Sequence, residues 1–161
     1  MKLRNVPFSP PDMTEAEAAE VRDAILSGWI TTGPRTKKLE KEVAAFVGVD
    51  KAVCLGSQTA CGEMALRLLG IGAGDEVIVP AYTYTASASV VTHVGATLVF
   101  VDVQKDCLKM DYEAVERVIT PRTKAIIPVD LAGIPCDYDR LFAIVERKRN
   151  LFVPVSYTHL R

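Results

Sequence analysis

The stretch Ala52-Val53-Cys54-Leu55-Gly56-Ser57-Gln58-Thr59-Ala60 changes character at its one glycine. The apolar residues before Gly56 predict a strand over Ala52–Leu55, and the pattern after it predicts a helix over Thr59–Leu69. The first turn of a helix has backbone N–H groups without intrahelical partners, and the helix dipole adds about half a positive charge there. This order of strand, turn and helix therefore suits a bound phosphate. The alternative is a turn that only caps the helix.

The rest of the chain alternates between strands and helices. Strands are predicted over Glu76–Val79, Leu98–Val101 and Ala125–Val129, with a last strand beginning in Leu151–Val155. Helices are predicted over Thr85–Val94, Asp111–Ile119 and Asp137–Arg149. Strands that are apolar on both faces and separated by helices are typical of a mainly parallel sheet with helices on both faces. We therefore expect an α/β fold whose ligands bind at the carboxyl ends of the strands.

Two helices and a loop are predicted ahead of this alternation. Met13–Leu26 begins with a capping box, in which Thr14 is followed three residues later by Glu17. A second helix is predicted after Pro34 and ends at Gly48. The loop between them, Gly28-Trp29-Ile30-Thr31-Thr32-Gly33-Pro34, holds the one tryptophan of the chain. Trp29 is either a packing anchor or part of a binding wall.

Composition excludes several classes of protein. The 161 residues carry a formal net charge of −1 and no basic stripe, which argues against nucleic acid or an anionic membrane surface as a partner. No apolar run approaches the roughly 18 residues that span a bilayer, and the N-terminus lacks the apolar stretch of a signal peptide. The four cysteines have no CxxC spacing, and we expect the two in apolar or helical context to be buried and reduced. A cytoplasmic enzyme fits, and the two histidines predict no metal site.

Two tyrosines directly follow the strand predicted over Glu76–Val79. Tyr82 and Tyr84 stand in Pro80-Ala81-Tyr82-Thr83-Tyr84-Thr85-Ala86, at the carboxyl end of that strand. An aromatic ring there can lie flat against a planar ligand, although it can also pack under its own loop. A phosphate-binding turn and an aromatic wall on neighbouring strand ends together favour a flat, phosphorylated cofactor.

Four blocks of sequence, in the same order, resemble the DegT/StrS-type sugar aminotransferases. They are Trp29–Pro34, Gly56–Ala60, Gly72-Ala73-Gly74-Asp75-Glu76-Val77-Ile78-Val79-Pro80 and Ile119-Thr120-Pro121-Arg122-Thr123-Lys124-Ala125-Ile126-Ile127-Pro128. This family consists of fold-type I, pyridoxal-phosphate enzymes that aminate keto-sugars on nucleotide carriers. The first block is similar to members that act on UDP-4-keto-pentoses and related hexoses, such as UDP-4-amino-4-deoxy-L-arabinose–oxoglutarate aminotransferase-like proteins.

The resemblance implies roles for particular residues. Thr59 and Ala60 would present backbone N–H groups to the phosphate of pyridoxal 5'-phosphate, with Ser57 beside them, and Tyr84 would stack on the pyridine ring. Thr31, Thr32 and Gly33 would lie in a substrate-binding loop. The implied partners are a nucleotide-sugar substrate, an amino-acid donor such as glutamate, and a second copy in a homodimer. Asp130 stands where many members have histidine, and Cys61-Gly62-Glu63 departs from the family's alanine-rich helix start.

No catalytic residue is assigned. The resemblance places the lysine that binds the cofactor covalently, and the carboxylate beside the pyridine nitrogen, further along than Leu151. Lys105, Lys109 and Lys124 are interpreted as solvated surface charges, and residues 156–161 match nothing in the family. We therefore expect an N-terminal helical segment with the substrate loop over 1–50, a partial large domain over 51–155 truncated partway, and a non-native tail.

Two other functions stay open at this point. One is a non-catalytic regulatory or assembly protein of the same fold. The other is a nucleotide-binding α/β domain, although the turn from Gly56 to Cys61 lacks the Gly-x-Gly-x-x-Gly pattern.

Overall fold

The computed structural model describes residues 11–148 and 151–157. The chain divides into two compact units, one up to Cys54 and one from Leu55 onward.

Unit 1 contains two helices, α1 (Glu15–Leu26) and α2 (Pro34–Val47). The predicted capping box is confirmed, because Thr14 Oγ1 accepts from the N–H of Ala16 at 3.2 Å while the Glu17 carboxylate accepts from the N–H of Thr14 at 2.6 Å. Helix α2 has Pro34 in its first turn, where the missing N–H costs nothing, and it ends at Gly48 in the left-handed conformation.

Unit 1 buries little of its apolar surface among the described residues. Helix α1 has no buried residue, and Ala44 is the one buried residue of α2. The prediction of a strand over Ala52–Leu55 is wrong. No described strand offers this segment a ladder of hydrogen bonds, Val53 is 72% exposed, and the N–H of Cys54 instead donates to the Glu40 carboxylate at 2.9 Å.

Unit 2 is built on a parallel three-stranded sheet in the order β2-β1-β3. Its elements alternate along the chain much as predicted. They are α3 (Gln58–Leu68), β1 (Glu76–Pro80), α4 (Ala86–His93), β2 (Thr97–Val101), α5 (Tyr112–Val118), β3 (Thr123–Ile126), β4 (Val129–Asp130), η1 (Leu131–Gly133), α6 (Tyr138–Lys148) and β5 (Ser156–Tyr157).

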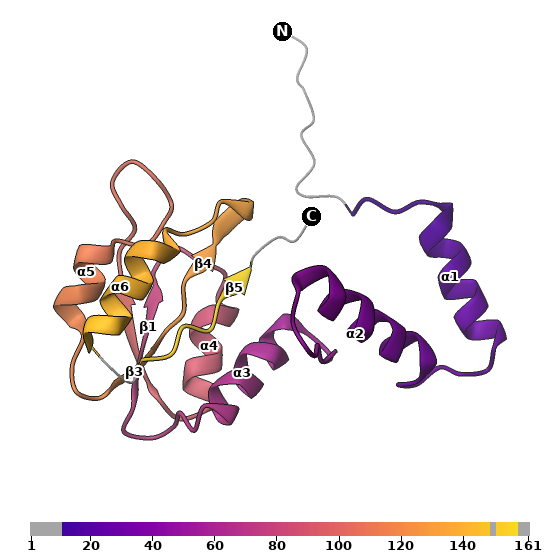
Figure 1. The fold of residues 1–161 in the computed structure, drawn as a ribbon, viewed down its shortest axis with the longest axis horizontal. Helices are drawn as coiled ribbons and strands as arrows, with labels where there is room; N and C mark the ends of the chain where they lie inside the picture. Colours follow the sequence, from indigo (N-terminus) through magenta and orange to yellow (C-terminus); the bar gives the residue numbers. More distant parts are fainter. Residues whose placement is uncertain (1–10, 149–150, 158–161) are drawn as a thin grey trace, which may run out of the picture. The chain divides into compact units, whose positions relative to one another are not determined.

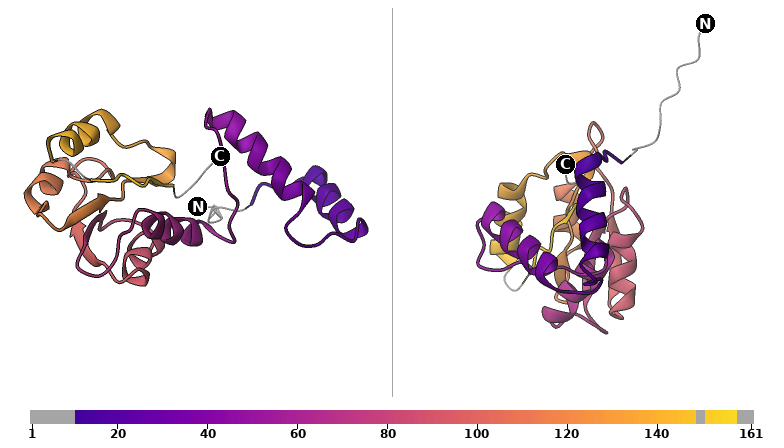
Figure 2. Two further views of the ribbon diagram at one scale, coloured as in Figure 1. Left: turned by 60° about the horizontal axis from the view of Figure 1, so that its bottom comes forward. Right: turned by 90° about the vertical axis from the view of Figure 1, so that its right-hand side faces the viewer.

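Helices cover both faces of this sheet, as the sequence predicts. On one face Val77 and Val79 pack with Leu66 of α3 and Val91 of α4. On the other face Ile78 and Ile126 belong to a second cluster, together with these residues of α5 and α6: Val115, Leu141 and Ile144. Figure 1 and the left view of Figure 2 show α3 and α4 on one side of the strands and α5 and α6 on the other.

Two predicted strands need correction. The strand predicted over Ala125–Val129 is broken into β3 and β4, because Pro128 has no N–H to donate to a ladder. Over Leu151–Val155 the structure has only a bridge between Phe152 and Ala125, and the following pair, β5, lies parallel to β4. Arg149, the predicted end of the last helix, lies outside the described residues.

A buried carboxylate ties the start of β1 to the turn before β3. Glu76 is 4% exposed, and its carboxylate accepts from the Thr120 hydroxyl at 2.5 Å, from the Arg122 guanidinium at 2.6 and 2.9 Å and from the Thr123 hydroxyl at 3.3 Å. The Thr120 hydroxyl, followed by the Arg122 guanidinium, holds the pKa of Glu76 below its ordinary value. The polar ends of β1 and β3 are therefore fixed opposite the ends at which a ligand is expected.

Candidate functional site

The turn before α3 caps the helix through Ser57. Ser57 is the N-cap residue, and its hydroxyl accepts from the N–H of Ala60 at 3.1 Å. The N–H of Cys61 donates to the Ser57 carbonyl at 3.0 Å, as the first bond of the helix. Among the described residues, no group accepts from the N–H of Thr59. The backbone N–H of Thr59 is therefore available to an anion. The N–H of Ala60 could bind an anion only by sharing its hydrogen bond with the Ser57 hydroxyl or by giving that bond up.

The turn after β1 leaves both tyrosines exposed. Tyr82 is 57% and Tyr84 is 71% exposed, so neither ring packs under its own loop. The backbone is nevertheless held, since the Tyr84 carbonyl accepts from the N–H of Ser87 at 3.1 Å and the hydroxyls of Thr83 and Ser87 lie 3.1 Å apart. Tyr84 thus has a fixed main chain and a free ring face.

A cavity of about 320 Å³ lies between the first turns of α3 and α4. Three small residues, Gly62, Ala65 and Ala86, keep it open, and a Cβ on Gly62 would lie 3.4 Å from Val90 Cγ1. The remaining lining residues are Gln58, Cys61, Ser87, Val90, Ile127, Pro154 and Val155. The cavity therefore sits at the start of α4, which follows the carboxyl end of β1, the end of the sheet at which a ligand is expected.

None of the four predicted cofactor-binding residues lines this cavity, but each lies within two residues of one that does. Ser57, Thr59 and Ala60 belong to the same turn as Gln58 and Cys61, and Tyr84 comes shortly before Ala86. Sequence reasoning missed Cys61 as a lining residue, and its prediction for cysteines in apolar or helical context is wrong at two positions, because Cys54 and Cys61 are exposed. Helical spacing carries the missed signal, since Gln58, Cys61 and Ala65 recur on one side of α3.

The predicted substrate loop lies in unit 1. Thr31 and Thr32 are exposed, whereas Gly33 is buried as the N-cap residue of α2. The indole Nε1 of Trp29 donates to the Thr32 carbonyl at 3.2 Å, so Trp29 packs within its own loop.

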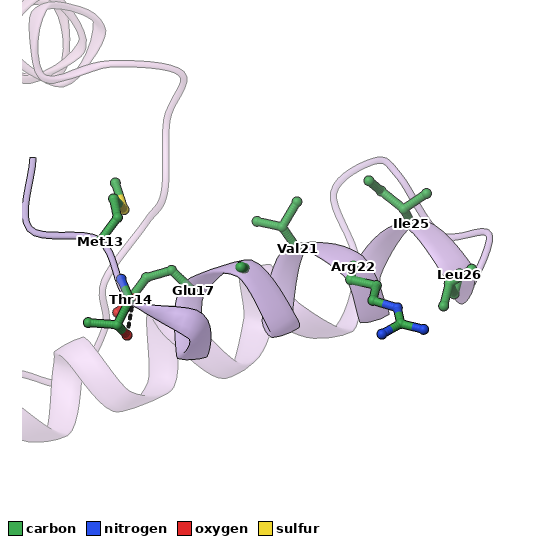
Figure 3. A pocket seen from close by; sticks show the side chains of 8 residues that line it. Met13, Thr14, Glu17, Val21, Arg22, Ile25 and Leu26 are labelled. Carbon is green, nitrogen blue, oxygen red and sulfur yellow. Dashed lines mark hydrogen bonds between the residues drawn. The ribbon is translucent and has the colours of Figure 1, made fainter.

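Unit 1 also has an open apolar hollow of about 570 Å³ along α1. Figure 3 shows Met13, Val21 and Ile25 projecting from one side of the helix, while Glu17 is engaged in the capping box. The hollow supplies a surface for packing and no converging polar groups.

A buried polar network surrounds Asp130, at the end of β4. Its carboxylate accepts from the N–H of Cys136 at 2.9 Å and from the Tyr138 hydroxyl at 2.8 Å. Burial raises the pKa of the Cys136 thiol. Burial also raises the pKa of Tyr112 to about 12, and the hydroxyl of Tyr112 accepts from the N–H of Asp137 at 2.6 Å. These bonds secure the segment from Leu131 to Asp137.

The remaining titratable groups form surface links. His93 Nδ1 lies 3.1 Å from the Glu63 carboxylate, which also accepts from Arg67 at 2.8 Å. Within the described part of the chain, no three His, Cys, Asp or Glu side chains are grouped so as to hold a metal ion. No helix of that same part is long and apolar enough to cross a bilayer.

A parallel sheet covered on both faces, with a capped helix and an aromatic turn at its carboxyl edge, defines the α/β class of the fold-type I aminotransferases. Residues 11–153 match the DegT/DnrJ/EryC1/StrS aminotransferase family, and the chain belongs to this family. The family resemblance predicted from the four sequence blocks is thereby confirmed.

Three relatives illustrate the similarity. The spore coat polysaccharide biosynthesis protein SpsC of Bacillus subtilis is 41% identical over 96% of this chain. The PLP form of the sugar aminotransferase Spr1654 from Streptococcus pneumoniae is 61% identical over 95% of the chain, with a TM-score of 0.87. DesV from S. venezuelae, solved with a ketimine intermediate, is 41% identical over 88% of the chain, with a TM-score of 0.80. The chain spans 39% of the length of each of these three proteins.

Proposed function

We propose that this chain supplies the coenzyme-phosphate turn and the substrate loop of a pyridoxal-phosphate-dependent aminotransferase. Its reaction transfers an amino group, with glutamate as donor, to a nucleotide-linked keto-sugar in cell-surface polysaccharide or amino-sugar biosynthesis. The relatives support this proposal, since they include sugar aminotransferases in PLP and PMP forms and a spore coat polysaccharide protein. The observation that carries it is the N–H of Thr59 at the start of α3, beside the Ser57 hydroxyl; this N–H donates to no group in the described part of the chain.

The residues present fit this coenzyme. Thr59 and the Ser57 hydroxyl offer hydrogen bonds to a phosphate at a helix N-terminus, where the dipole favours negative charge. The exposed ring of Tyr84 can cover a pyridine, and the adjoining cavity of about 320 Å³ has small apolar side chains that admit a flat ring. A phosphate donor set and an apolar slot are therefore available at the same end of unit 2.

When bound, the coenzyme supplies the group that carries the amino nitrogen and the ring that accepts electrons. The side chains of this chain hold and orient it: Ser57 and Thr59 at the phosphate and Tyr84 at the ring face. Thr31, Thr32 and Gly33 form the loop that meets the nucleotide-sugar. We propose no catalytic lysine or pyridine-nitrogen carboxylate in this chain.

The proposal extends to assembly and location. We propose a homodimer as the working form, in the cytoplasm, where nucleotide sugars and glutamate serve as substrates. The exposed apolar side chains of unit 1, such as Val21 and Phe46, support association with another protein surface.

Titration of the full chain with pyridoxamine 5'-phosphate tests the proposal, since this probe needs no lysine to bind. Binding is measured by saturation-transfer NMR. We expect pyridoxamine 5'-phosphate to bind, and pyridoxamine without its phosphate to bind weakly or not at all. The Thr59→Pro variant removes the N–H in a helix turn that tolerates proline and should weaken binding about tenfold, the value of one charge-assisted hydrogen bond.

Thr59→Val is the matched control, because it keeps the N–H and the branched shape while removing the hydroxyl. It should bind more tightly than Thr59→Pro. The proposal fails if Thr59→Pro binds the probe as the unmodified chain does, or if removing the phosphate from the probe changes nothing.

A further inference from the structure

Trp29 is held in its loop at two points, one through its backbone and one through its side chain. Its backbone N–H donates to the Ser27 hydroxyl at 3.2 Å, and that hydroxyl donates to the Ala24 carbonyl at 2.7 Å, which anchors the residue to the end of α1. At the other side, the indole Nε1 donates to the Thr32 carbonyl at 3.2 Å. The indole therefore spans the loop from Trp29 to Thr32, the residue before Gly33.

Gly33 lies directly under this ring. A Cβ at position 33 would overlap Trp29 Nε1 and would lie 2.6 Å from both Cδ1 and Cε2 of the indole. The backbone of Gly33, with φ at −170°, is extended and open to any residue. The requirement for glycine thus comes from the space that the indole occupies, not from the backbone conformation.

The loop enclosed by these contacts leads straight into α2. The Gly33 carbonyl accepts from the N–H of Lys37 at 3.0 Å, and Pro34 fixes the backbone at the start of the helix. The exposed threonines Thr31 and Thr32 are therefore held between the Trp29 ring and the first turn of α2. Ordering a loop before its ligand arrives lowers the entropy cost of binding.

We propose that Trp29 is the positioning residue of the substrate loop: its indole, seated on Gly33 and bonded to the Thr32 carbonyl, holds Thr31 and Thr32 in one conformation for a nucleotide diphosphate sugar. This inference rests on the proposed function. It also gives Gly33 a role other than direct contact with substrate, because its lack of a side chain admits the ring.

The first part of the test uses Trp29 as its own probe, since it is the one tryptophan of the chain. Gly33→Ala should expel the indole, shift its emission to longer wavelength and raise its acrylamide quenching. The ring is already 55% exposed, so the gain in quenching should not exceed about twofold. Gly72→Ala is the matched control, because a Cβ there would make an ordinary 3.5 Å contact with the Val94 carbonyl. Its spectrum should equal that of the unmodified chain.

The second part measures binding of UDP-glucose to the full chain by calorimetry. Gly33→Ala should weaken binding about tenfold, and Trp29→Phe, which keeps a ring but removes the N–H donor, about threefold, within the usual value of one hydrogen bond. Trp29→Phe decides the matter if Gly33→Ala fails to fold by circular dichroism. Neither variant should change binding of pyridoxamine 5'-phosphate, whose site lies in unit 2.

The outcomes separate the two proposals. Absence of pyridoxamine phosphate binding by the unmodified chain overturns the proposed function. If that binding is intact, unchanged emission in Gly33→Ala, unchanged UDP-glucose affinity in Trp29→Phe, or no UDP-glucose binding by the unmodified chain overturns the positioning role of Trp29.

Discussion

The helices of unit 1 and those of unit 2 carry apolar side chains at the same spacing but differ in what covers them. In unit 2, Leu66, Val115 and Leu141 are fully buried against the sheet. In unit 1, Ile25 of α1 is 62% exposed and Phe46 of α2 is 93% exposed. Spacing therefore predicts a helix and its apolar side, but it does not say whether that side is covered within the described chain.

The two units consequently depend on different forces. Unit 1 is held by local devices: the Thr14–Glu17 capping box, Pro34 at the start of α2, and the Trp29 loop. Isolated helices of this length are marginal in water without packing. Unit 2 is held by burial on both faces of a sheet, and we expect such a unit to unfold cooperatively.

Core truncation should give the largest difference between the units. We expect Ile126→Ala, which empties a fully buried position, to lower the free energy of unfolding by about 2–5 kcal/mol. Phe46→Ala in α2 should change it by less than about 0.5 kcal/mol, because the ring is already solvated. Urea unfolding followed by circular dichroism measures both. Equal losses would show that α2 is covered in solution.

Alkaline pH should give the second largest effect, a loss of stability in unit 2. The pKa of Tyr112 is raised to about 12 by burial, so its neutral form is favoured in the folded state. That stabilisation is complete below pH 10 and is lost as the pH rises from 10 to 12. Because a pKa shift is worth 1.36 kcal/mol per unit and the loss continues past pH 12, the free energy lost within this window is at most about 2 kcal/mol. The raised pKa of Cys136 adds a loss that begins above pH 9.

Unit 1 serves as the internal control, because its sequence has no tyrosine. Tyr112→Phe should flatten the loss between pH 10 and 12, measured as Tm against pH. An unchanged slope in that variant would contradict the assignment to Tyr112.

Acid should weaken unit 2 through Glu76. Because the Thr120 hydroxyl and then Arg122 hold its pKa below the ordinary value, the stabilisation is present above pH 4.5 and is lost as pH falls through the lower folded value. We expect Glu76→Gln to lower Tm at pH 7 by a few degrees and to reduce its slope below pH 4.5. The effect should be modest because the Arg122 side chain is 70% exposed.

Glu17→Gln is the matched change in unit 1, where the Thr14 hydroxyl lowers the pKa of an exposed carboxylate. It should leave the Tm of unit 2 unchanged at every pH. A shift as large as that of Glu76→Gln would mean that the two units unfold together.

Helix caps should give the smallest effects. Asp111 accepts from the N–H groups of Glu113 and Ala114, so Asp111→Ala should cost about 1 kcal/mol in the unfolding of unit 2. Thr14→Ala should only fray α1, seen as faster amide exchange in its first turn. Global destabilisation by Thr14→Ala would erase the distinction drawn between the units.

Sequence reasoning succeeded where one local pattern decides the outcome. The helices and strands of unit 2 begin and end near their predicted positions, since apolar periodicity and capping residues such as Asp111 act locally. It failed where the outcome depends on a partner strand or on a residue that interrupts a strand. Ala52–Leu55 is as apolar as β1 but has no strand beside it among the described residues, and Pro128 interrupts a run that hydrophobicity alone reads as continuous.

The candidate site shows the same division. The turn from Ser57 to Ala60 is visible in sequence because a cap is a local signal, whereas the cavity that includes Ile127 depends on strand order. The role of Gly33 could not be predicted, because its backbone is ordinary and only the placement of the Trp29 ring explains it.

The strand order β2-β1-β3 also bears on how the chain acquires its fold. Strand β1 is the first of the three strands to be synthesised, yet it takes the central position. Its residue Glu76 contacts Thr123, which lies 47 residues later in the chain. A contact between residues so far apart in sequence raises the contact order. Folding is slower because the entropy of closing the loop is lost before the contact forms. During synthesis, the wholly apolar run Val77–Val79 would emerge well before either neighbouring strand, so nascent unit 2 exposes an unpaired apolar strand until β2 and β3 have been made.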